Sequence, residues 1–454
     1  MRSDKTPSSW LLRQAAVTLL LVCCRPFWEV GATEQNTSET PFDVIHYDAQ
    51  IEPDIARKTV TGEVLIRLRA NTDNLASITL DCGELEPDVV SEKGVALKFT
   101  RQAQRMTVWL SAPAKARETR EIEIAYHGSP QRGIRFFPEL DQVYTVFSTS
   151  QWMVCMDAPD DRATFRLRLI LPADLTAVAN GRLVSQRILS NRKTAYEWEQ
   201  ESPIPTYIFG FAAGRFRTLS EKAGKVELRY LAAQFSDEEV RRIFRDTPDM
   251  LRFFEGVAGV PYADQTYTQA LAAGGIEQEM SSFTALNERY GRRVLANERD
   301  NWLGAHEFAH QWWGNMVTNR DWNHFWLNEG MATFLASAYR EHRFGRELYL
   351  GDIEGYRSTY ERIRQAGKDR SLVFPDWNRP TPEDRQLVYE KGAYVLHLLR
   401  EEMGERLFWS GLRQYTSKYF GKSVVTADFQ KAMEQSSGKN LGEFFARWVY
   451  LTQR

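Results

Sequence analysis

Two histidines four residues apart, His306 and His310, occur in the stretch NWLGAHEFAHQWWGN. On a helix, positions i and i+4 lie one turn apart on the same face, so both imidazoles can bind one metal ion. Glu307 projects about 100° further round, where its carboxylate can reach a water molecule without binding the ion. Zinc suits this arrangement, because two imidazoles and one carboxylate leave a fourth position for water. The alternative is that both histidines are ordinary core or surface residues.

A third ligand decides between these interpretations. The stretch WNHFWLNEGMATF places Glu329 after His310, with eighteen residues between them, in the first turn of a second expected helix. A polar loop joins the two expected helices, and antiparallel packing would bring Glu329 beside His306 and His310. The sequence therefore predicts one catalytic Zn2+ ion bound by His306, His310 and Glu329.

The elements that must position these residues lie in the second half of the chain. Over residues 42–218, segments such as KTVTGEVLIRLRA and REIEIAYHG alternate or run apolar between turn residues, which predicts strands. Beyond them the apolar period becomes helical, starting from a capping-box pattern at Ser236 and Glu239. Further helices are expected over residues 300–313, 328–345 and 389–404. We predict an all-β domain over residues 42–218 and a mainly helical catalytic domain over residues 219–454.

Composition and charge narrow the classes of function. The 454 residues are 43% apolar and 26% charged, which is typical of a folded protein with two or three domains. The 58 Lys and Arg residues nearly balance the 60 Asp and Glu residues, so no nucleic-acid partner is expected. Cys82 and Cys155 are the cysteines beyond the N-terminal segment. They can form one bridge in an oxidising compartment, but two buried free thiols are the favoured interpretation.

The N-terminal segment has the pattern of a secretory signal peptide. Basic residues precede an apolar run over residues 15–24, and Val30 and Ala32 supply the small-residue pattern of a cleavage site. The run is too short to span a bilayer comfortably. We therefore expect a signal peptide over residues 1–32, a polar leader over residues 33–41, and an exported protein, periplasmic or extracellular, with no stable membrane span after cleavage. The alternatives are an uncleaved segment that anchors the protein in a membrane and a buried N-terminal helix.

The combination of HEFAHQWWGN with WLNEG resembles the gluzincin zinc aminopeptidases of the aminopeptidase N and leukotriene-hydrolase family. The resemblance implies that His306, His310 and Glu329 bind catalytic zinc and that Glu307 is the general base. These residue types suit that chemistry, because zinc lowers the pKa of water toward neutrality and Glu307 can take the proton during attack on a peptide carbonyl.

An upstream stretch resembles the family's Gly-x-Met-Glu-Asn exopeptidase strand, here Gly274, Gly275, Ile276, Glu277 and Gln278. The resemblance implies that this strand binds the substrate and that Glu277 binds its free α-amino group. A carboxylate fixed near zinc favours a cationic N-terminus and leaves room for one residue before the scissile bond. Ile276 and Gln278 depart from the family's Met and Asn, and a purely structural role for Glu277 is the alternative.

A downstream stretch, LVYEKGAYVLHLL, resembles the family's Tyr-x-Lys-Gly segment. The resemblance implies that the hydroxyl of Tyr389 stabilises the tetrahedral oxyanion. A preorganised donor aimed at developing negative charge lowers the barrier by about 3 kcal/mol. A buried structural tyrosine is the alternative.

The stretch WMVCMDAPDD matches the family's Pro-Cys-x-Asp-x-Pro pattern, with Val154 in place of the first proline. The resemblance therefore implies an α+β multidomain fold, in which an N-terminal all-β saddle-like domain precedes a thermolysin-like, mainly helical catalytic domain with a small mixed sheet. The chain ends at LGEFFARWVYLTQR, where relatives continue into a helical C-terminal domain, so a short form with a more open cleft is expected. Ala336 stands where the family often has a second acidic residue, so a different outer support of the metal is expected.

The resulting prediction is a zinc-dependent aminopeptidase that hydrolyses N-terminal residues from peptides. One alternative is a zinc endopeptidase or other hydrolase on the same scaffold, which would also cut substrates with a blocked N-terminus. A second is a non-catalytic peptide-binding protein, which would need neither a general base nor an oxyanion donor. Nothing in the sequence indicates a particular oligomeric state. The aromatic residues near the metal ligands are expected to pack in the core: Trp312, Trp313, Trp322, Phe325 and Trp326.

Overall fold

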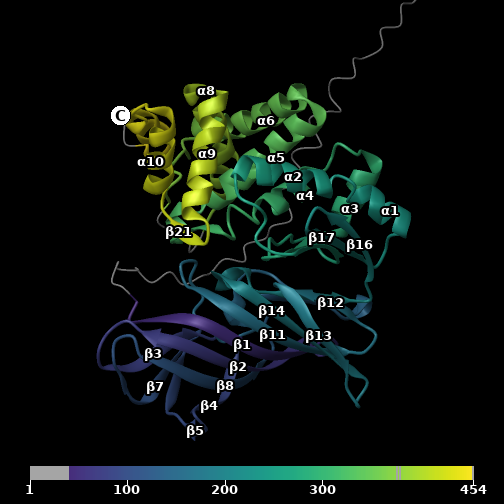
Figure 1. Cartoon of the computed structure of the whole chain (residues 1–454), viewed down its shortest axis with the longest axis vertical. Helices are drawn as coiled ribbons and strands as arrows, with labels where there is room; N and C mark the ends of the chain where they lie inside the picture. The colour runs from purple at the N-terminus through teal and green to yellow at the C-terminus, as the bar shows by residue number, and fades with distance from the viewer. Residues whose placement is uncertain (1–39, 375–376, 378–379, 452–454) are drawn as a thin grey trace, which may run out of the picture.

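The computed structural model describes residues 40–374, 377 and 380–451, so the expected signal peptide and most of the expected polar leader lie outside the described residues. The described chain folds into a β-rich part and a mainly helical part, and the helical part lies above the β-rich part in Figure 1. This order confirms the predicted fold class, an all-β region followed by a helical region with a small mixed sheet. No helix among the described residues is long and apolar enough to cross a membrane.

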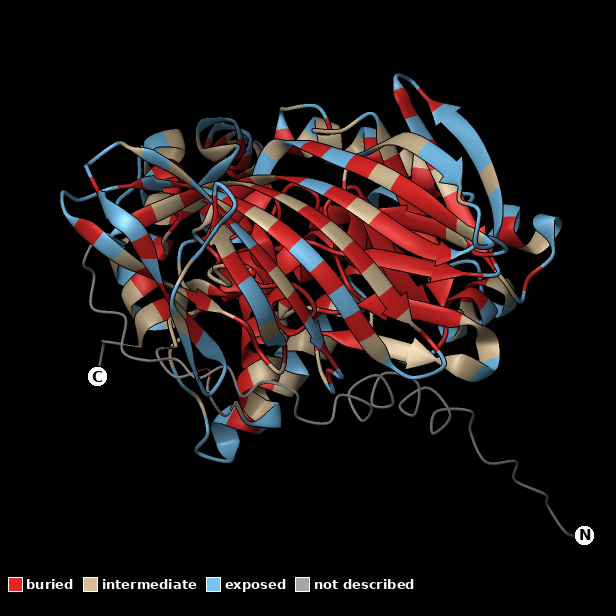
Figure 2. Cartoon of the chain, turned by 90° about the horizontal axis from the view of Figure 1, so that it is seen from below, coloured by how far each residue is buried: buried red, intermediate tan, exposed pale blue. Residues whose placement is uncertain are grey.

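An eight-stranded sheet forms the base of the β-rich part. In spatial order its strands are β13 (Arg182–Ile188), β14 (Lys193–Pro205), β11 (Arg162–Pro172), β1 (Phe42–Asp54), β2 (Thr59–Ala70), β8 (Thr119–Gly128), β4 (Glu86–Glu92) and β5 (Val95–Ala96). Strand β1 pairs antiparallel with β2 and parallel with β11. Every second residue of β2 is buried, because successive side chains point to opposite faces of a sheet, and Figure 2 shows this alternation along the strands.

Two smaller sheets complete the β-rich part. One contains β3 (Leu75–Asp81), β7 (Arg105–Ala114) and β6 (Phe99–Gln102), and the other contains β12 (Thr176–Ala179), β15 (Phe211–Gly214), β10 (Gln142–Thr145) and β9 (Ile134–Phe137). Short 3-10 turns also occur here: η2 (Pro138–Leu140), η3 (Thr149–Gln151) and η4 (Thr206–Ile208). The core of this part includes Cys82 and Cys155, which are buried free thiols, as the sequence predicts.

The helical part begins with a four-stranded mixed sheet. Its strands, in spatial order, are β16 (Arg217–Ala223), β17 (Val226–Ala232), β18 (Thr266–Ala272) and β19 (Phe283–Asn287). Strands β16 and β17 are antiparallel, whereas β17, β18 and β19 run parallel. Because β15 pairs within the β-rich part and β16 within this sheet, the chain passes from one part to the other over residues 215–216.

Helices make up most of the second part. They are α1 (Asp237–Ile243), α2 (Thr247–Ala258), α3 (Glu288–Ala296), α4 (Trp302–Ala309), α5 (Trp326–Phe344), α6 (Arg346–Gln365), α7 (Pro382–Gln386), α8 (Gly392–Met403), α9 (Glu405–Tyr419), α10 (Thr426–Ser437) and α11 (Gly442–Phe445). Between or after them lie β20 (Val317–Asn319), η5 (Trp322–His324), β21 (Lys422–Val424) and the π turns η6 (Leu387–Lys391) and η7 (Ala446–Tyr450). The expected capping box is present at the start of α1, where Ser236 and Glu239 bind each other's backbone amides.

Helix α4 is shorter than the sequence predicts. The helix expected over residues 300–313 ends at Ala309, and His310 is its C-cap residue, still with helical angles of φ −56° and ψ −24°. Beyond it Gly314 has a φ of +132°, which residues with a side chain rarely adopt, and its amide donates to the carbonyl of Val317. The chain therefore turns away directly after the second histidine.

Candidate metal and active site

Helix α4 brings two imidazoles together. His306 lies in its last turn and His310 caps it, so the i, i+4 relation expected from the sequence is retained. The Nε2 atoms of the two rings are 3.1 Å apart. Both side chains are buried, because the core of the helical part surrounds the helix.

Glu329 approaches the same point from the first turn of α5. Its Oε2 atom lies 3.4 Å from the Nε2 atom of each histidine. The three ligand atoms all lie within 4.8 Å of one another. Only 2% of the Glu329 side chain is exposed, and its Oε2 atom is buried without a hydrogen bond in the described part of the chain. A buried carboxylate oxygen in this state needs a cationic partner.

These distances fit a zinc ion. Ligand atoms about 2.0–2.1 Å from a tetrahedral zinc are about 3.3 Å from one another. The observed separations of 3.1, 3.4 and 3.4 Å agree with this value. Two imidazoles with one carboxylate are also the donor set of many catalytic zinc sites.

The remaining nitrogen of each imidazole has its own partner. His310 Nδ1 lies 3.1 Å from the carbonyl oxygen of Trp313. Because a carbonyl only accepts, the neutral ring carries its proton on Nδ1, which leaves the lone pair of Nε2 for a metal. His306 Nδ1 lies 3.4 Å from the hydroxyl of Thr333, one turn beyond Glu329 on α5. Thr333 was not expected from the sequence, and it supplies a polar contact on this helix although Ala336 offers none.

Glycine at position 314 is required by the second histidine. A Cβ atom there would lie 2.8 Å from His310 Nδ1, in addition to the unfavourable positive φ. Gly314 therefore lets the turn after α4 fold closely over the imidazole of His310, which the Trp313 carbonyl in the same turn orients.

Carboxylates dominate the electrostatics of the site. Burial raises the pKa of Glu307 well above its usual value, and the charges of Glu279 and Glu277 add to this rise although His310 opposes it. Burial disfavours the charged form of His310, but Glu329 and the other carboxylates outweigh burial and raise its pKa to about 10. Burial also opposes the charged form of Glu329, yet the two histidines lower its pKa to about 2. The site is thus preorganised for positive charge.

The segment expected to bind the substrate is an irregular bend rather than a strand. Within it only Gln278 pairs with another backbone segment, opposite Ala285. Gly274 has a φ of +92°, and nothing lies within 4 Å of the point where Gly275 would carry a Cβ atom. Glu277 is half-buried, and burial raises its pKa to about 7, although Arg293 and Arg289 act in the opposite direction. Open space and an ionisable carboxylate therefore occur in one segment, and the charge of that carboxylate acts on Glu307.

Gln278 is placed differently from a substrate-binding amide. It is fully buried, its Oε1 atom accepts from the backbone amide of Phe147, and its Nε2 atom donates to Glu279. Both ends of the amide are therefore used within the protein, and Gln278 orders the segment in this structure. Glu279, which was not expected from the sequence, is also buried, and burial raises its pKa to about 7.

Tyr389 lies on the π turn η6, and its half-buried ring is nearly parallel to that of His306, with centroids 6.0 Å apart. The two elements that carry Tyr389 and Glu329 approach very closely. A Cβ atom on Gly330 would lie 3.0 Å from the Cα atom of Gly392, so a side chain there would force the two backbones slightly apart. The Gly residues of the NEG and Tyr-x-Lys-Gly patterns thus meet at one helix crossing.

Lys391 anchors the π turn. Its ammonium is completely buried and donates to Asp369 at 2.7 Å and to the carbonyl of Arg370 at 2.9 Å.

A third residue not expected from the sequence is Trp302, whose ring stacks on His306 at 4.9 Å and whose Nε1 atom donates to the hydroxyl of Tyr356. Its position four residues before His306 on the helix was the available signal.

The fold and the site together define a class of protein, a two-domain zinc metallopeptidase. The family model "Peptidase M1 N-terminal domain" matches residues 44–208, and the model "Peptidase family M1 domain" matches residues 249–448. The chain belongs to peptidase family M1.

Relatives and solved structures agree with this assignment. The chain is 25% identical to leukotriene A-4 hydrolase of Xenopus laevis and to leucine aminopeptidase 2 of Aspergillus fumigatus, over 426 and 421 residues. These matches cover 87% and 86% of the chain, and the chain spans 68% and 66% of the relatives. It is also similar, at 25% identity and a TM-score of 0.76, to a mutant M1 zinc metallopeptidase from Deinococcus radiodurans bound to a Tyr-Ser-Ala substrate. That match covers 91% of this chain and 95% of the other.

Proposed function

We propose that the protein is a zinc aminopeptidase that removes N-terminal residues from peptides. One observation carries the proposal: the half-buried carboxylate of Glu277 lies within electrostatic reach of Glu307, which is itself beside the three metal ligands. A carboxylate at this position is suited to bind the α-ammonium of a substrate, which places the first peptide bond at the metal. An endopeptidase site would gain nothing from such an anchor.

Each residue has a definite role in the proposed reaction. Bound zinc supplies Lewis acidity that makes water a nucleophile near neutral pH. Glu277 fixes the substrate amine, Gly275 leaves space for the substrate backbone beside it, and Gly274 supplies the bend that its positive φ allows. Glu307 takes a proton from the attacking water and delivers it to the leaving nitrogen. The hydroxyl of Tyr389 donates to the carbonyl oxygen as negative charge develops on that atom.

The relatives support peptides as substrates. Leucine aminopeptidase 2 is an aminopeptidase by name, the Deinococcus structure contains a tripeptide substrate, and a similar structure of a two-domain M1 zinc metallopeptidase contains L-tryptophan. We extend this substrate class to the present chain because the ligand set, the base and the amine-binding carboxylate occur together in it.

The test is a panel of aminoacyl fluorogenic substrates, each with a free and an acetylated N-terminus. We expect cleavage of free amines only, no measurable activity in Glu307→Gln, and a loss of about 10- to 100-fold in kcat/KM for Glu277→Gln, since a charged hydrogen bond contributes about 1.5–3 kcal/mol. Glu238→Gln, an exposed change on α1, is the matched control and should retain full activity. Equal cleavage of acetylated substrates would instead indicate an endopeptidase or a broader hydrolase.

We also propose that the protein is exported to the periplasm or the cell exterior. The support is the N-terminal pattern of basic residues, an apolar run and the small residues Val30 and Ala32. Mass spectrometry of the exported protein should find an N-terminus at residue 33, and a cytoplasmic protein with an intact Met1 would contradict export.

A further inference from the structure

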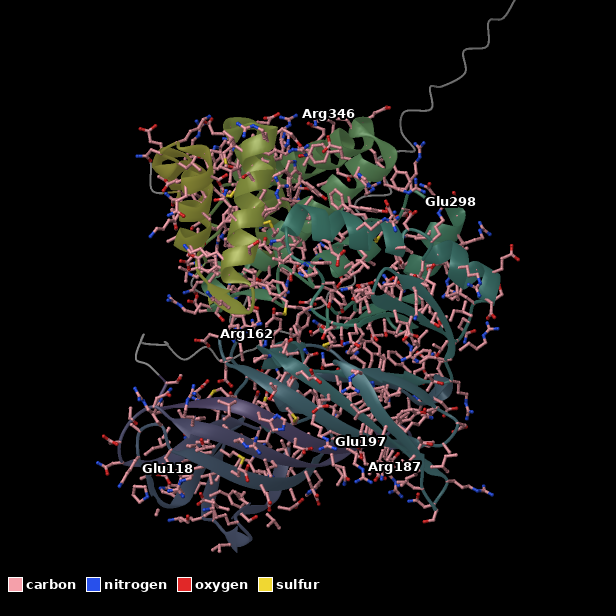
Figure 3. The ribbon with its side chains drawn as sticks, viewed as in Figure 1. Glu118, Arg162, Arg187, Glu197, Glu298 and Arg346 are labelled. Atoms are coloured by element: carbon pink, nitrogen blue, oxygen red, sulfur yellow. The ribbon has the colours of Figure 1, made fainter. Side chains whose placement is uncertain are left out.

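The turn after helix α4 is embedded in the β-rich part of the molecule. We define this metal turn as residues 313–318. Met316, at its centre, is buried in the hydrophobic core of the β-rich part rather than in that of the helical part. Figure 3 labels Arg162 of β11 at the junction between the two parts. The region that orients His310 therefore folds against a segment more than a hundred residues away in sequence.

The hydroxyl of Tyr207, on the turn η4 of the β-rich part, contacts both metal-ligand segments. It donates to the carbonyl of Gly314 at 3.0 Å, within the metal turn. It also accepts from the Nδ2 atom of Asn328 at 3.1 Å, and Asn328 directly precedes Glu329. One oxygen atom thus joins the metal turn to the first turn of α5. The metal turn contains the Trp313 carbonyl that orients His310, and the first turn of α5 carries the third ligand, Glu329.

The environment keeps this hydroxyl protonated. Tyr207 is 1% exposed, and burial together with the nearby carboxylates Glu279 and Glu329 raises its pKa well above the usual value. Asn328 is held in turn by the backbone amide of Asn319, which donates to its Oδ1 atom at 3.2 Å. The hydroxyl of Tyr207 is therefore a neutral group that bridges Gly314 and Asn328, donating to the first and accepting from the second.

Arg162 holds the metal turn at a second point. Its Nη1 atom donates to the hydroxyl of Thr318 at 2.9 Å, and its Nη2 atom donates to the carbonyls of Asn315 and Pro203. Thr318 then donates to the carbonyl of Gly314 at 2.7 Å, the oxygen that Tyr207 also binds. The two contacts from the β-rich part thus converge on one carbonyl, four residues beyond His310.

We propose that Tyr207 is a positioning residue of the metal site, through which the β-rich part sets the relative placement of His310 and Glu329. The proposal rests on the zinc site of the proposed function. Loss of an outer partner of a metal ligand typically costs 10- to 100-fold in metal affinity. Because Tyr207 acts through one further residue on each side, we expect the lower end, about tenfold.

The test measures zinc affinity of the full chain by competition with a chromophoric chelator. Tyr207→Phe removes only the bridging oxygen, and Tyr126→Phe is the matched control. Tyr126 is equally buried in the β-rich part, and its hydroxyl donates to the carbonyl of Trp152 at 3.2 Å, away from the metal ligands. Thermal unfolding of the zinc-free variants shows how much stability each change removes without the metal.

We expect the zinc Kd to rise about tenfold in Tyr207→Phe and to stay within about twofold in Tyr126→Phe. Asn328→Ser removes the same bridge from its other end, so its effect on Kd should be similar and should not add to that of Tyr207→Phe. If Tyr207→Phe fails to fold, Asn328→Ser alone decides the question. Unchanged affinity in these variants, with tight binding by the wild type, overturns the positioning role alone. A wild type that does not bind zinc overturns the proposed function, and the positioning role with it.

Discussion

The proposed anchor for the substrate amine predicts a specific dependence of binding on pH. Burial outweighs Arg293 and Arg289 and raises the pKa of Glu277 to about 7. A carboxyl with a raised pKa is ionised above that value and protonated below it, so its ability to bind a cation is lost as the pH falls through 7. The α-amino group of a peptide has a pKa of about 7.7–8.0 and loses its charge as the pH rises. Tight binding needs both groups charged.

The size of the effect follows from these two values. At pH 6 about a tenth of Glu277 is ionised while nearly all of the peptide amine is charged. Near pH 7.4 about seven tenths of Glu277 and about three quarters of the amine are charged. The fraction of productive pairs therefore peaks near pH 7.4, is about sixfold lower at pH 6, and falls again by a similar factor at about pH 9.

Calorimetric titration can measure this profile without turnover. In a Glu307→Gln background, which cannot move the proton, the Kd of a tripeptide with a free amine would be measured from pH 6 to pH 9. Its acetylated counterpart should bind more weakly and without the bell shape. Adding Glu277→Gln should remove the acid limb. A free-amine tripeptide with the same Kd at pH 6 and pH 7.4, or an acid limb that survives Glu277→Gln, would refute the assignment of Glu277 as the amine anchor.

Two further predictions concern the elements that carry the site. Lys391→Met leaves the carboxylate of Asp369 without its buried partner, so the free energy of unfolding should fall by about 3 kcal/mol. Because Lys391 anchors the π turn, kcat should fall more than KM rises, and a change in KM alone would contradict this role. Gly330→Ala places a methyl group 3.0 Å from the backbone of α8. This should lower the free energy of unfolding by about 1–3 kcal/mol and should also lower kcat. The control Gly351→Ala lies on α6 with open space around it and should stabilise the protein slightly, so equal losses in both variants would argue against close packing as the cause.

The sequence predicted those features of the site that depend on local spacing. The helical i, i+4 relation fixed the two histidines on one face, and the packing of α5 against α4 explains the approach of Glu329. The capping box at Ser236 was equally predictable, because both partners lie within one helical turn. The alternation of apolar residues likewise indicated the strands of the β-rich part.

Features that depend on tertiary contacts could not be read from the pattern. Apolar residues at helical spacing continue to residue 313, yet α4 ends at Ala309, because the chain there packs into a different core through Met316. The environment of Gln278 is another example, since Phe147 lies on a loop of the β-rich part. No sequence pattern marks Thr333. Its role follows only from the folded structure, which places the ring of His306 beside its hydroxyl.

The short helix explains why the β-rich part contributes to the metal site. In a longer helix, the backbone beyond His310 would be held by the next turn of helical hydrogen bonds. Here the helix stops, and the imidazole is oriented by the carbonyl of Trp313 in a turn that contains Gly314, a residue with few conformational restraints. Hydrogen bonds within the turn restrain it, and Tyr207 and Arg162 add restraint from the β-rich part. The boundary between the two parts of the fold therefore runs along the metal turn, and a fragment that contains only the helical part should lose zinc affinity even where its own core is complete.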